Sequence, residues 1–196
     1  MFDLVPHIVS AGYVGLFTVV FVESGLFFGF FLPGDSLLFT VGLLASQGVF
    51  DIALMLALLS VAAVAGDSVG YAFGKRVGQA LFSRPESRFF KPDHMLRANK
   101  FFTNHGKKSV FLARFIPIVR TFVPIVAGIA RMPYRDFLFY NMFGGVFWVF
   151  SMTLFGYTLG VYVPNAEAYL YPIVALIVAI SFFPVFFQAA SRRSKK

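Results

Sequence analysis

Long apolar segments run through most of this chain, and short polar stretches separate them. Three of the segments are unbroken and are predicted to cross a membrane as helices: residues 51–74, 137–163 and 169–188. At about 1.5 Å per residue, residues 51–74 would form a helix of about 36 Å, which spans a bilayer with some tilt. The link at residues 164–168 is short, so the last two spans are predicted to be antiparallel neighbours.

Two further apolar segments, residues 17–48 and 109–130, are interrupted by glycine and proline. Proline removes a helical hydrogen bond and clashes with the preceding turn, and the freed backbone groups cannot face lipid. Both segments are therefore predicted to be re-entrant hairpins whose breaks are buried in protein or line a watery cavity. The supporting breaks are Pro33, Gly34, Pro117 and Pro124.

The charges predict a topology. Residues 1–74 contain five acidic residues and no Lys or Arg, whereas all 17 basic residues lie from Lys75 onward. Because cytoplasmic loops carry an excess of Lys and Arg, the loop 75–108 and the tail 189–196 are both predicted to be cytoplasmic. Two spans lie between the end of segment 109–130 and the cytoplasmic tail, so this end is also cytoplasmic. The segment begins next to the cytoplasmic loop 75–108. Because it begins and ends on the same side, it must be re-entrant.

A weak internal repeat favours a second hairpin at residues 17–48, since a shift of 94 residues places Gly34 on Gly128. A short amphipathic helix is predicted before each hairpin, the first at residues 1–16. The predicted fold is a single all-α polytopic membrane domain, an inverted repeat with two opposed re-entrant hairpins, about three full spans and amphipathic interfacial helices. The alternative for the N-terminal half is a full span over residues 9–31.

Composition supports a membrane protein and excludes several other classes. Hydrophobic residues make up 58% of the 196 residues and charged residues only 13%, which is too apolar for a soluble domain of this size. The sequence has no cysteine, and its three histidines have no ligand spacing, so neither a metal nor a cofactor is expected. The basic stretches adjoin membrane segments, so they are interpreted as topology signals rather than as a nucleic-acid-binding surface.

Four charged residues lie within the broken segments and are the candidate functional residues: Glu23, Asp35, Arg114 and Arg120. A charge at membrane depth costs about 2.5–3.5 kcal/mol on insertion scales and usually marks function. The break at Pro117 could turn Arg114 and Arg120 toward one point, where their donors suit phosphate oxygens. Protonation of a half-buried carboxylate responds to burial and to a nearby arginine, so Glu23 and Asp35 could carry protons. The alternative is a buried ion-pair lock between the hairpins.

These motifs, taken together, resemble the DedA family of bacterial inner-membrane proteins, which contain the VTT domain. The resemblance covers about residues 8–188 and rests on Glu23, on Pro33-Gly34-Asp35, on Gly66-Asp67-x-x-Gly70-Tyr71 and on Arg114-x-x-Pro117-x-x-Arg120. Asp67 and Tyr71 are accessory candidates, with a helix-packing face as an equal alternative. Lys75 departs from the family pattern, in which many relatives have Arg.

The resemblance implies a flippase that depends on the proton motive force and carries undecaprenyl phosphate or a phospholipid such as phosphatidylethanolamine. It also implies that the essential acids are Glu23 and Asp35 and that the essential arginines are Arg114 and Arg120. The expected location is the bacterial inner membrane, with several spans and a cytoplasmic C-terminus.

The sequence hypothesis is therefore a lipid transporter rather than an enzyme. Arg114 and Arg120 would hold the lipid phosphate, and Glu23 and Asp35 would couple protons. Two alternatives are a proton-coupled exporter of small cations and a non-transporting membrane-organising protein. A lipid phosphatase is disfavoured, because no histidine lies in the broken segments. The expected partners are membrane lipids and protons, with no nucleic acid and with a homo-oligomer left open.

Overall fold

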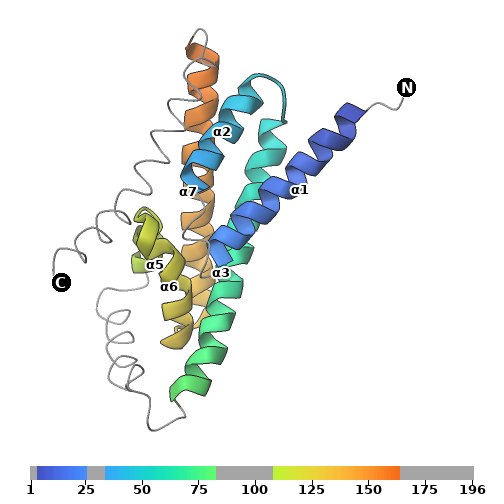
Figure 1. Cartoon of the computed structure of the whole chain (residues 1–196). Coiled ribbons are helices and arrows are strands. Elements are labelled where there is room, and N and C mark those ends of the chain that lie inside the picture. Colours follow the sequence, from blue (N-terminus) through green and yellow to red (C-terminus); the bar gives the residue numbers. More distant parts are fainter. Residues whose placement is uncertain (1–3, 26–33, 83–107, 164–196) are drawn as a thin grey trace, which may run out of the picture.

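The computed structural model describes residues 4–25, 34–82 and 108–163, and this part of the chain folds entirely into α-helices and the turns between them (Figure 1). The helices are α1 (Leu4–Gly25), α2 (Gly34–Ser46), α3 (Ile52–Phe82), α5 (Lys108–Ala113), α6 (Pro117–Ile129) and α7 (Tyr134–Tyr162). The predicted all-α class is confirmed for these residues. The predicted span at 169–188 and the tail at 189–196 lie outside them.

Two long helices form the axis of the described structure. The stretches Ile52–Val77 of α3 and Tyr134–Tyr162 of α7 are each long and apolar enough to cross a membrane. The two helices run in opposite directions and pack against each other (Figure 1). Helix α3 continues beyond residue 74 to Phe82, so the beginning of the predicted basic loop 75–108 is helical.

The shorter helices occupy the two ends of this axis. Helices α1 and α2 lie beside one half of the long helices, whereas α5 and α6 lie beside the other half (Figure 1). Helix α3 packs against α1 and α6, and α2 packs along α7. Helix α2 and the end of α1 fall in the first predicted hairpin and α5 and α6 in the second, but a re-entrant path through a bilayer stays a prediction.

Two local features differ from the sequence expectation. Helix α1 is continuous through residues 16 and 17, because its proline, Pro6, lies in the first turn, where backbone N–H groups have no helical acceptor. Pro117 begins α6 as expected, but Pro124 lies inside that helix without ending it. A proline within a helix can bend it without stopping it, and Pro124 here faces Gly70, which leaves space for its ring.

Glycines allow the helix backbones to touch, as the small-residue spacing of the sequence predicts. A Cβ on Gly66 of α3 would meet the backbone of α1, and a Cβ on Gly74 would meet the backbone of α6 at Ile125. On α7, a Cβ on Gly156 would meet the backbone of α2 at Phe39. Such close contacts are typical of helices that associate within membranes.

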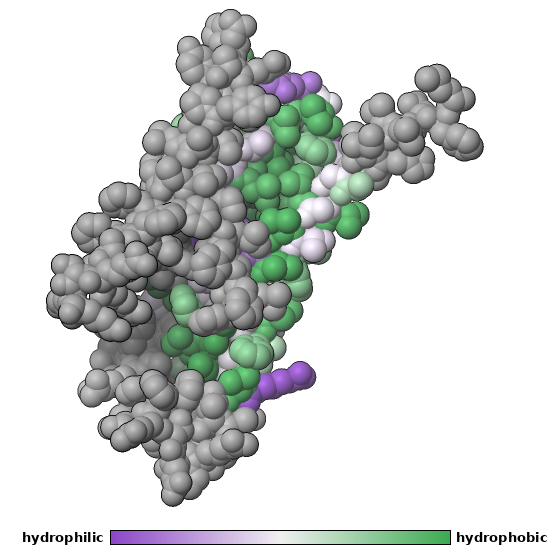
Figure 2. All heavy atoms as spheres, in the orientation of Figure 1, coloured by the Kyte–Doolittle hydropathy of each residue, from purple (hydrophilic) through white to green (hydrophobic). Residues whose placement is uncertain are grey.

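The outer surface of the described helices is largely apolar. Phe139, Phe143 and Phe147 of α7 are each more than half exposed. Figure 2 shows hydrophobic residues covering the described part of one face, with hydrophilic residues toward its two ends. This surface suits a lipid environment, because a soluble monomer rarely exposes a continuous apolar area of this kind.

Candidate functional site

The first polar cluster joins three of the shorter helices around Arg120. From α6, the Nη1 of Arg120 donates a hydrogen bond of 2.7 Å to Oδ1 of Asp35, which lies in the first turn of α2. Its Nη2 donates to the carboxylate of Glu23, near the end of α1. Arg120 thus contacts two other predicted site residues directly, and the three come from three different helices.

Glu23 is the most deeply buried member of this cluster, with 1% of its surface exposed. Gly34 lies directly against its carboxylate, and a Cβ at position 34 would overlap with the carboxylate oxygens. The second oxygen, Oε2, is buried and accepts no hydrogen bond from the described residues. Gly34 therefore has a steric role at the site, in addition to the chain break that the sequence predicted.

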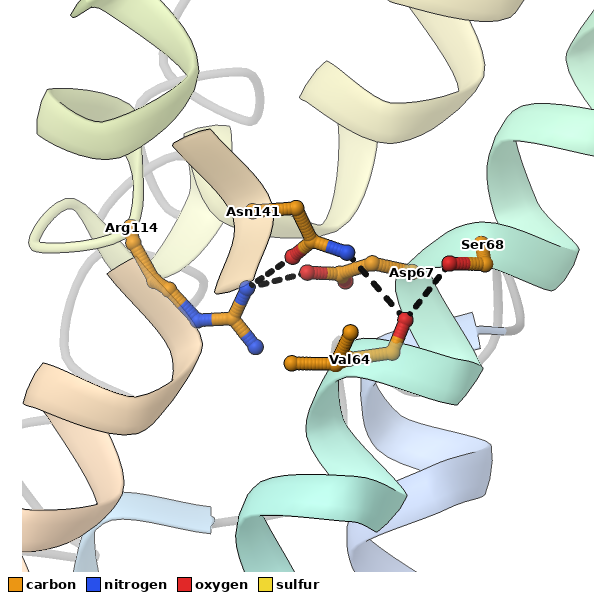
Figure 3. A network of polar contacts seen from close by, with 5 residues as sticks. All are labelled: Val64, Asp67, Ser68, Arg114 and Asn141. Carbon is orange, nitrogen blue, oxygen red and sulfur yellow. Dashed lines mark hydrogen bonds and ion pairs between the residues drawn. The ribbon is translucent and has the colours of Figure 1, made fainter. Parts of the chain in front are cut away.

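The second polar cluster surrounds Arg114 and involves the two long helices (Figure 3). The Nη1 of Arg114 donates to the carboxylate of Asp67 on α3 and, at 2.7 Å, to Oδ1 of Asn141 on α7. The amide nitrogen of Asn141 donates at 3.1 Å to the backbone carbonyl of Val64. Ser68 donates to the same carbonyl at 2.8 Å, so α3 and α7 together fix the partners of Arg114.

Trp148 of α7 lies against both arginines. The centre of its indole ring is 4.6 Å from the guanidinium carbon of Arg120 and 5.5 Å from that of Arg114. The indole Nε1 donates a hydrogen bond of 2.7 Å to Oδ1 of Asp35, the oxygen that Arg120 also contacts. Only 2% of Trp148 is exposed. The two arginines therefore meet at one indole, although their carboxylate partners differ.

The chain between α5 and α6 explains how both arginines reach this point. It leaves the helix after Ala113 and turns through residues 114–116 before Pro117 starts α6. The N–H groups of Arg114, Phe115 and Ile116 each donate to the carbonyl three residues earlier, so they are not free to bind an anion. The expected turning point is present, but its backbone N–H groups are already bonded, so only side chains could contact an anion there.

Two site residues, Asn141 and Trp148, were not identified as candidates from the sequence. Their positions share a helix face with Gly144 and Gly145, against which the Arg114 side chain packs. An inward helix face is indicated by this pattern within an apolar span: a polar residue, small residues and the single tryptophan at helical spacing.

The two accessory candidates have different surroundings. Asp67 belongs to the Arg114 cluster. Tyr71, one turn further along α3, instead donates from its hydroxyl to the carbonyl of Met132 and packs against the rings of Tyr134 and Phe137. Tyr71 therefore ties α3 to the start of α7. Among the residues that the structure describes, no group of three His, Cys, Asp or Glu side chains could hold a metal ion.

An apolar groove runs along the outside of α7 beside the Arg114 cluster. It consists of two adjoining hollows of about 370 and 330 Å³, and Phe111 and Phe143 line both. Lys108 and Tyr140 are the polar residues in its wall. Phe111 and the Arg114 side chain both pack near Gly144, because a Cβ there would lie 3.4 Å from an atom of each. The groove is therefore close to the buried guanidinium.

Comparison with known proteins finds one family and several relatives. The model of the VTT domain matches residues 32–158. The chain is 42% identical to Protein DedA of Escherichia coli K12 over 174 residues, which cover 88% of this chain and 79% of that protein. It is 43% identical over 171 residues to an uncharacterized membrane protein of Mycobacterium leprae, with coverage of 87% and 76%. It is 39% identical over 154 residues to the inner membrane protein YghB of Escherichia coli K12, with coverage of 79% and 70%. No solved structure matches.

Proposed function

The chain belongs to the DedA family of VTT-domain proteins and is a bacterial inner-membrane protein, and on this premise we propose that it carries a phosphate-bearing lipid across the membrane in a cycle that is coupled to protons. In this proposal Arg114 and Arg120 hold the lipid phosphate, while Glu23 and Asp35 exchange protons with water. The cargo would be undecaprenyl phosphate or a phospholipid such as phosphatidylethanolamine. The protein would be a transporter and not an enzyme.

The observation that carries this proposal is the unequal charge of the Arg120 cluster. Two carboxylates, the buried Glu23 and the partly buried Asp35, share one guanidinium, so the cluster has an excess of one negative charge when both are ionised. An uncompensated buried charge costs several kcal/mol, whereas one bound proton removes it. A simple structural lock would pair its charges one to one. The excess carboxylate supports a site that takes up and releases a proton.

A transport cycle follows from competition for the arginines. While Glu23 and Asp35 are ionised, they occupy Arg120. A first proton from the outer side removes the excess charge, and a second removes the last ionic partner of Arg120. The guanidinium is then free to attract a phosphate, which carries the negative charge that a neutral carboxyl group lacks. Loss of the protons to the cytoplasm restores the carboxylates, which displace the phosphate.

Asp67 is the carboxylate partner of Arg114, as Glu23 and Asp35 are the carboxylate partners of Arg120. It is buried and pairs with Arg114, so a phosphate that contacts both arginines must also compete with Asp67. This gives Asp67 a part in the proposed cycle that its sequence motif alone did not specify. Asn141 would keep a hydrogen bond to Arg114 while the carboxylate is exchanged.

The apolar groove offers a path for the hydrocarbon chain of such a lipid. Its walls are aromatic and aliphatic, and Phe111 brings it close to the side chain of Arg114. A lipid tail could therefore lie outside α7 while its phosphate reaches the buried arginines. The tail would remain in an apolar environment throughout transport, which avoids most of the cost of moving it.

The direct test is lipid transport by the purified full-length protein in sealed vesicles. A labelled undecaprenyl phosphate or phospholipid is placed in one leaflet, and its arrival in the other is followed with and without an imposed pH gradient. We expect an acceleration of at least tenfold with the gradient, and its loss in Arg120→Lys, since lysine lacks the planar fork. Arg76→Lys is the matched control, because Arg76 is exposed on α3.

Two results would contradict the proposal in different ways. Equal transport by Arg120→Lys and the wild-type protein would exclude the phosphate clamp. A rate that does not respond to the pH gradient would exclude proton coupling, even if the clamp variants lose transport. The small-cation exporter predicts instead that cations leave loaded vesicles and that lipid phosphates do not compete with them.

A further inference from the structure

One buried side chain connects the two arginine clusters and has no part in the proposed cycle so far. Trp148 lies against the guanidinium groups of both Arg114 and Arg120, and its N–H donates to Asp35. It is almost completely buried, on a long helix that also carries Asn141. A cation above an indole face and an indole N–H on a carboxylate are both favourable interactions, and burial strengthens each of them.

We propose that Trp148 is a positioning residue that holds both arginines in place while their counter-ion changes from carboxylate to phosphate. The proposal rests on the phosphate clamp described above. Trp148 couples the protonation of Asp35 to the positions of both guanidinium groups.

The need for such a residue follows from what protonation removes. When Glu23 and Asp35 are neutral, Arg120 loses the charged partners that fix its side chain. A long cationic side chain that is released at membrane depth tends to extend toward the interface, where its charge is hydrated. The indole face attracts the guanidinium whether or not the carboxylates are ionised. Trp148 therefore keeps Arg120 at the site during the exchange.

The link to Asp35 gives Trp148 a second function. Oδ1 of Asp35 accepts hydrogen bonds from both Arg120 and the indole N–H. Neutralising this oxygen weakens both bonds together, so the ring and the guanidinium respond to the same event. Because the ring also contacts Arg114, the change at α2 reaches the second cluster.

The charged groups around Trp148 come from every part of the site. Those in direct contact are Asp35 of α2, Arg120 of α6 and Arg114 of the α5–α6 turn, and those one contact further away are Glu23 of α1 and Asp67 of α3. An experiment on the coupling between Asp35 and Trp148 must therefore distinguish the effect of Asp35 from the effects of Glu23 and Asp67.

The chain supplies its own probe, because Trp148 is its single tryptophan. We expect the tryptophan emission of the purified protein in detergent to change reversibly as the pH is lowered from 8 until the emission reaches a plateau. Asp35→Asn should remove at least half of this change, since an asparagine cannot be protonated there. Glu23→Gln and Asp67→Asn should each retain more of the change than Asp35→Asn, because these two acids contact the arginines and Asp35 contacts the ring itself. Asp51→Asn, at an exposed acid far from the ring in sequence, is the control and should retain all of it.

Binding provides the second readout. Dodecyl phosphate is titrated into the wild-type protein, Trp148→Phe and Phe137→Leu, with calorimetric detection. Phenylalanine keeps a ring but loses the N–H and part of the face, so we expect binding about tenfold weaker and less dependent on pH. Phe137→Leu also truncates a fully buried ring of α7, but one that packs against Tyr71, so its binding should be unchanged.

The outcomes separate this inference from the proposed function. If Trp148→Phe binds dodecyl phosphate as the wild-type protein does, with the same pH profile, while Arg120→Lys loses binding, the clamp stands and the role of Trp148 is wrong. If Arg120→Lys also binds normally, the clamp itself is wrong. If Asp35→Asn keeps the full change in emission, Trp148 does not respond to Asp35. This last result overturns the link even where Trp148→Phe fails to fold.

Discussion

Arg120 and Arg114 lie against the same indole, but their polar partners differ in number, origin and charge. Arg120 contacts two carboxylates, Glu23 and Asp35, from helices of the first predicted hairpin. Arg114 contacts one carboxylate and one amide, both from the long helices. The Arg114 cluster is neutral, whereas the Arg120 cluster has one negative charge too many when fully ionised.

This difference indicates a division of roles. A neutral cluster that joins α3 to α7 stabilises the axis of the fold in every protonation state of its neighbour. A cluster with an excess charge, built from shorter helices, gains stability when a proton binds and can therefore exchange its counter-ion. In the proposed cycle both arginines would exchange a carboxylate for the phosphate, but only the Arg120 cluster would gain stability by first taking up a proton.

The largest effect on stability is expected from removing the side chain of Arg114. Arg114→Ala leaves Asp67 buried without its cation, and breaking a buried pair in this way typically costs about 3–5 kcal/mol. We expect a similar loss in the free energy of unfolding in detergent micelles, measured by circular dichroism. The double variant Arg114→Ala with Asp67→Asn should recover part of it, because the unpaired charge is gone.

If Arg114→Ala were no less stable than Arg76→Ala, the Arg114 cluster would not stabilise the fold as the contrast with Arg120 requires. Arg76 is exposed on the same helix as Asp67 and serves as the matched control. Its replacement should change the free energy of unfolding by about 0.5 kcal/mol or less, as for most surface positions.

A smaller effect is expected from crowding the exchangeable cluster. Gly34→Ala adds a methyl group that overlaps with the Glu23 carboxylate, and forced repacking of this kind costs about 1–3 kcal/mol. We expect a lower thermal midpoint and weaker transport. Gly15→Ala is the control, because a Cβ there meets nothing within 4 Å, and alanine in a helix interior favours the fold by about 1 kcal/mol. Equal stability of the two variants would show that Gly34 does not restrict Glu23.

A third variant gives the Arg114 cluster the same excess charge as the Arg120 cluster. Asn141→Asp places a second carboxylate beside Arg114, so this cluster also gains an excess negative charge. We expect a loss of about 1–3 kcal/mol at pH 8 and a smaller loss at pH 5. The folded variant would hold a proton that the unfolded chain releases, so its stability falls as pH rises.

Thermal unfolding of Asn141→Asp at the two pH values measures this effect. Asn141→Ala is the control, since it loses the hydrogen bonds of the amide without adding a charge. Its destabilisation should be the same at both values. A pH-independent loss in Asn141→Asp would mean that excess charge is not what distinguishes the two clusters.

The sequence predicted which charges lie together better than it predicted which ones pair. Charged residues in broken apolar segments are costly, so Glu23, Asp35 and Arg120 could be identified, and they are in contact. The partner of Arg114 could not be assigned. It depends on the register between α3 and α7, which is set by backbone contacts that no charge pattern reveals.

Uncharged site residues were harder to predict for a different reason. Asn141 and Trp148 lie in an apolar span, where an amide and a large ring have ordinary packing roles. The break before Pro117 followed from the chemistry of proline, but Pro124 shows the limit of that rule. Whether a proline ends a helix depends on what packs beside it, and here Gly70 on another helix makes the space.

The smallest change in stability is expected when the charged cluster is made neutral. Glu23→Gln keeps the shape of the side chain but leaves Asp35 as the single carboxylate beside Arg120. Two effects oppose each other, because the excess charge disappears while one charge-assisted hydrogen bond becomes weaker. We therefore expect a change in the free energy of unfolding of about 1 kcal/mol or less at neutral pH.

The functional consequence of Glu23→Gln should be much larger than this energetic one, and it decides what the excess charge is for. A neutral cluster needs no proton, so lipid transport by Glu23→Gln in vesicles should lose most of its acceleration by a pH gradient. Asp51→Asn, at an exposed carboxylate, should keep the wild-type response. If Glu23→Gln still responds fully to the gradient, the extra carboxylate is not the proton carrier. The contrast between the two arginines would then concern stability and not transport.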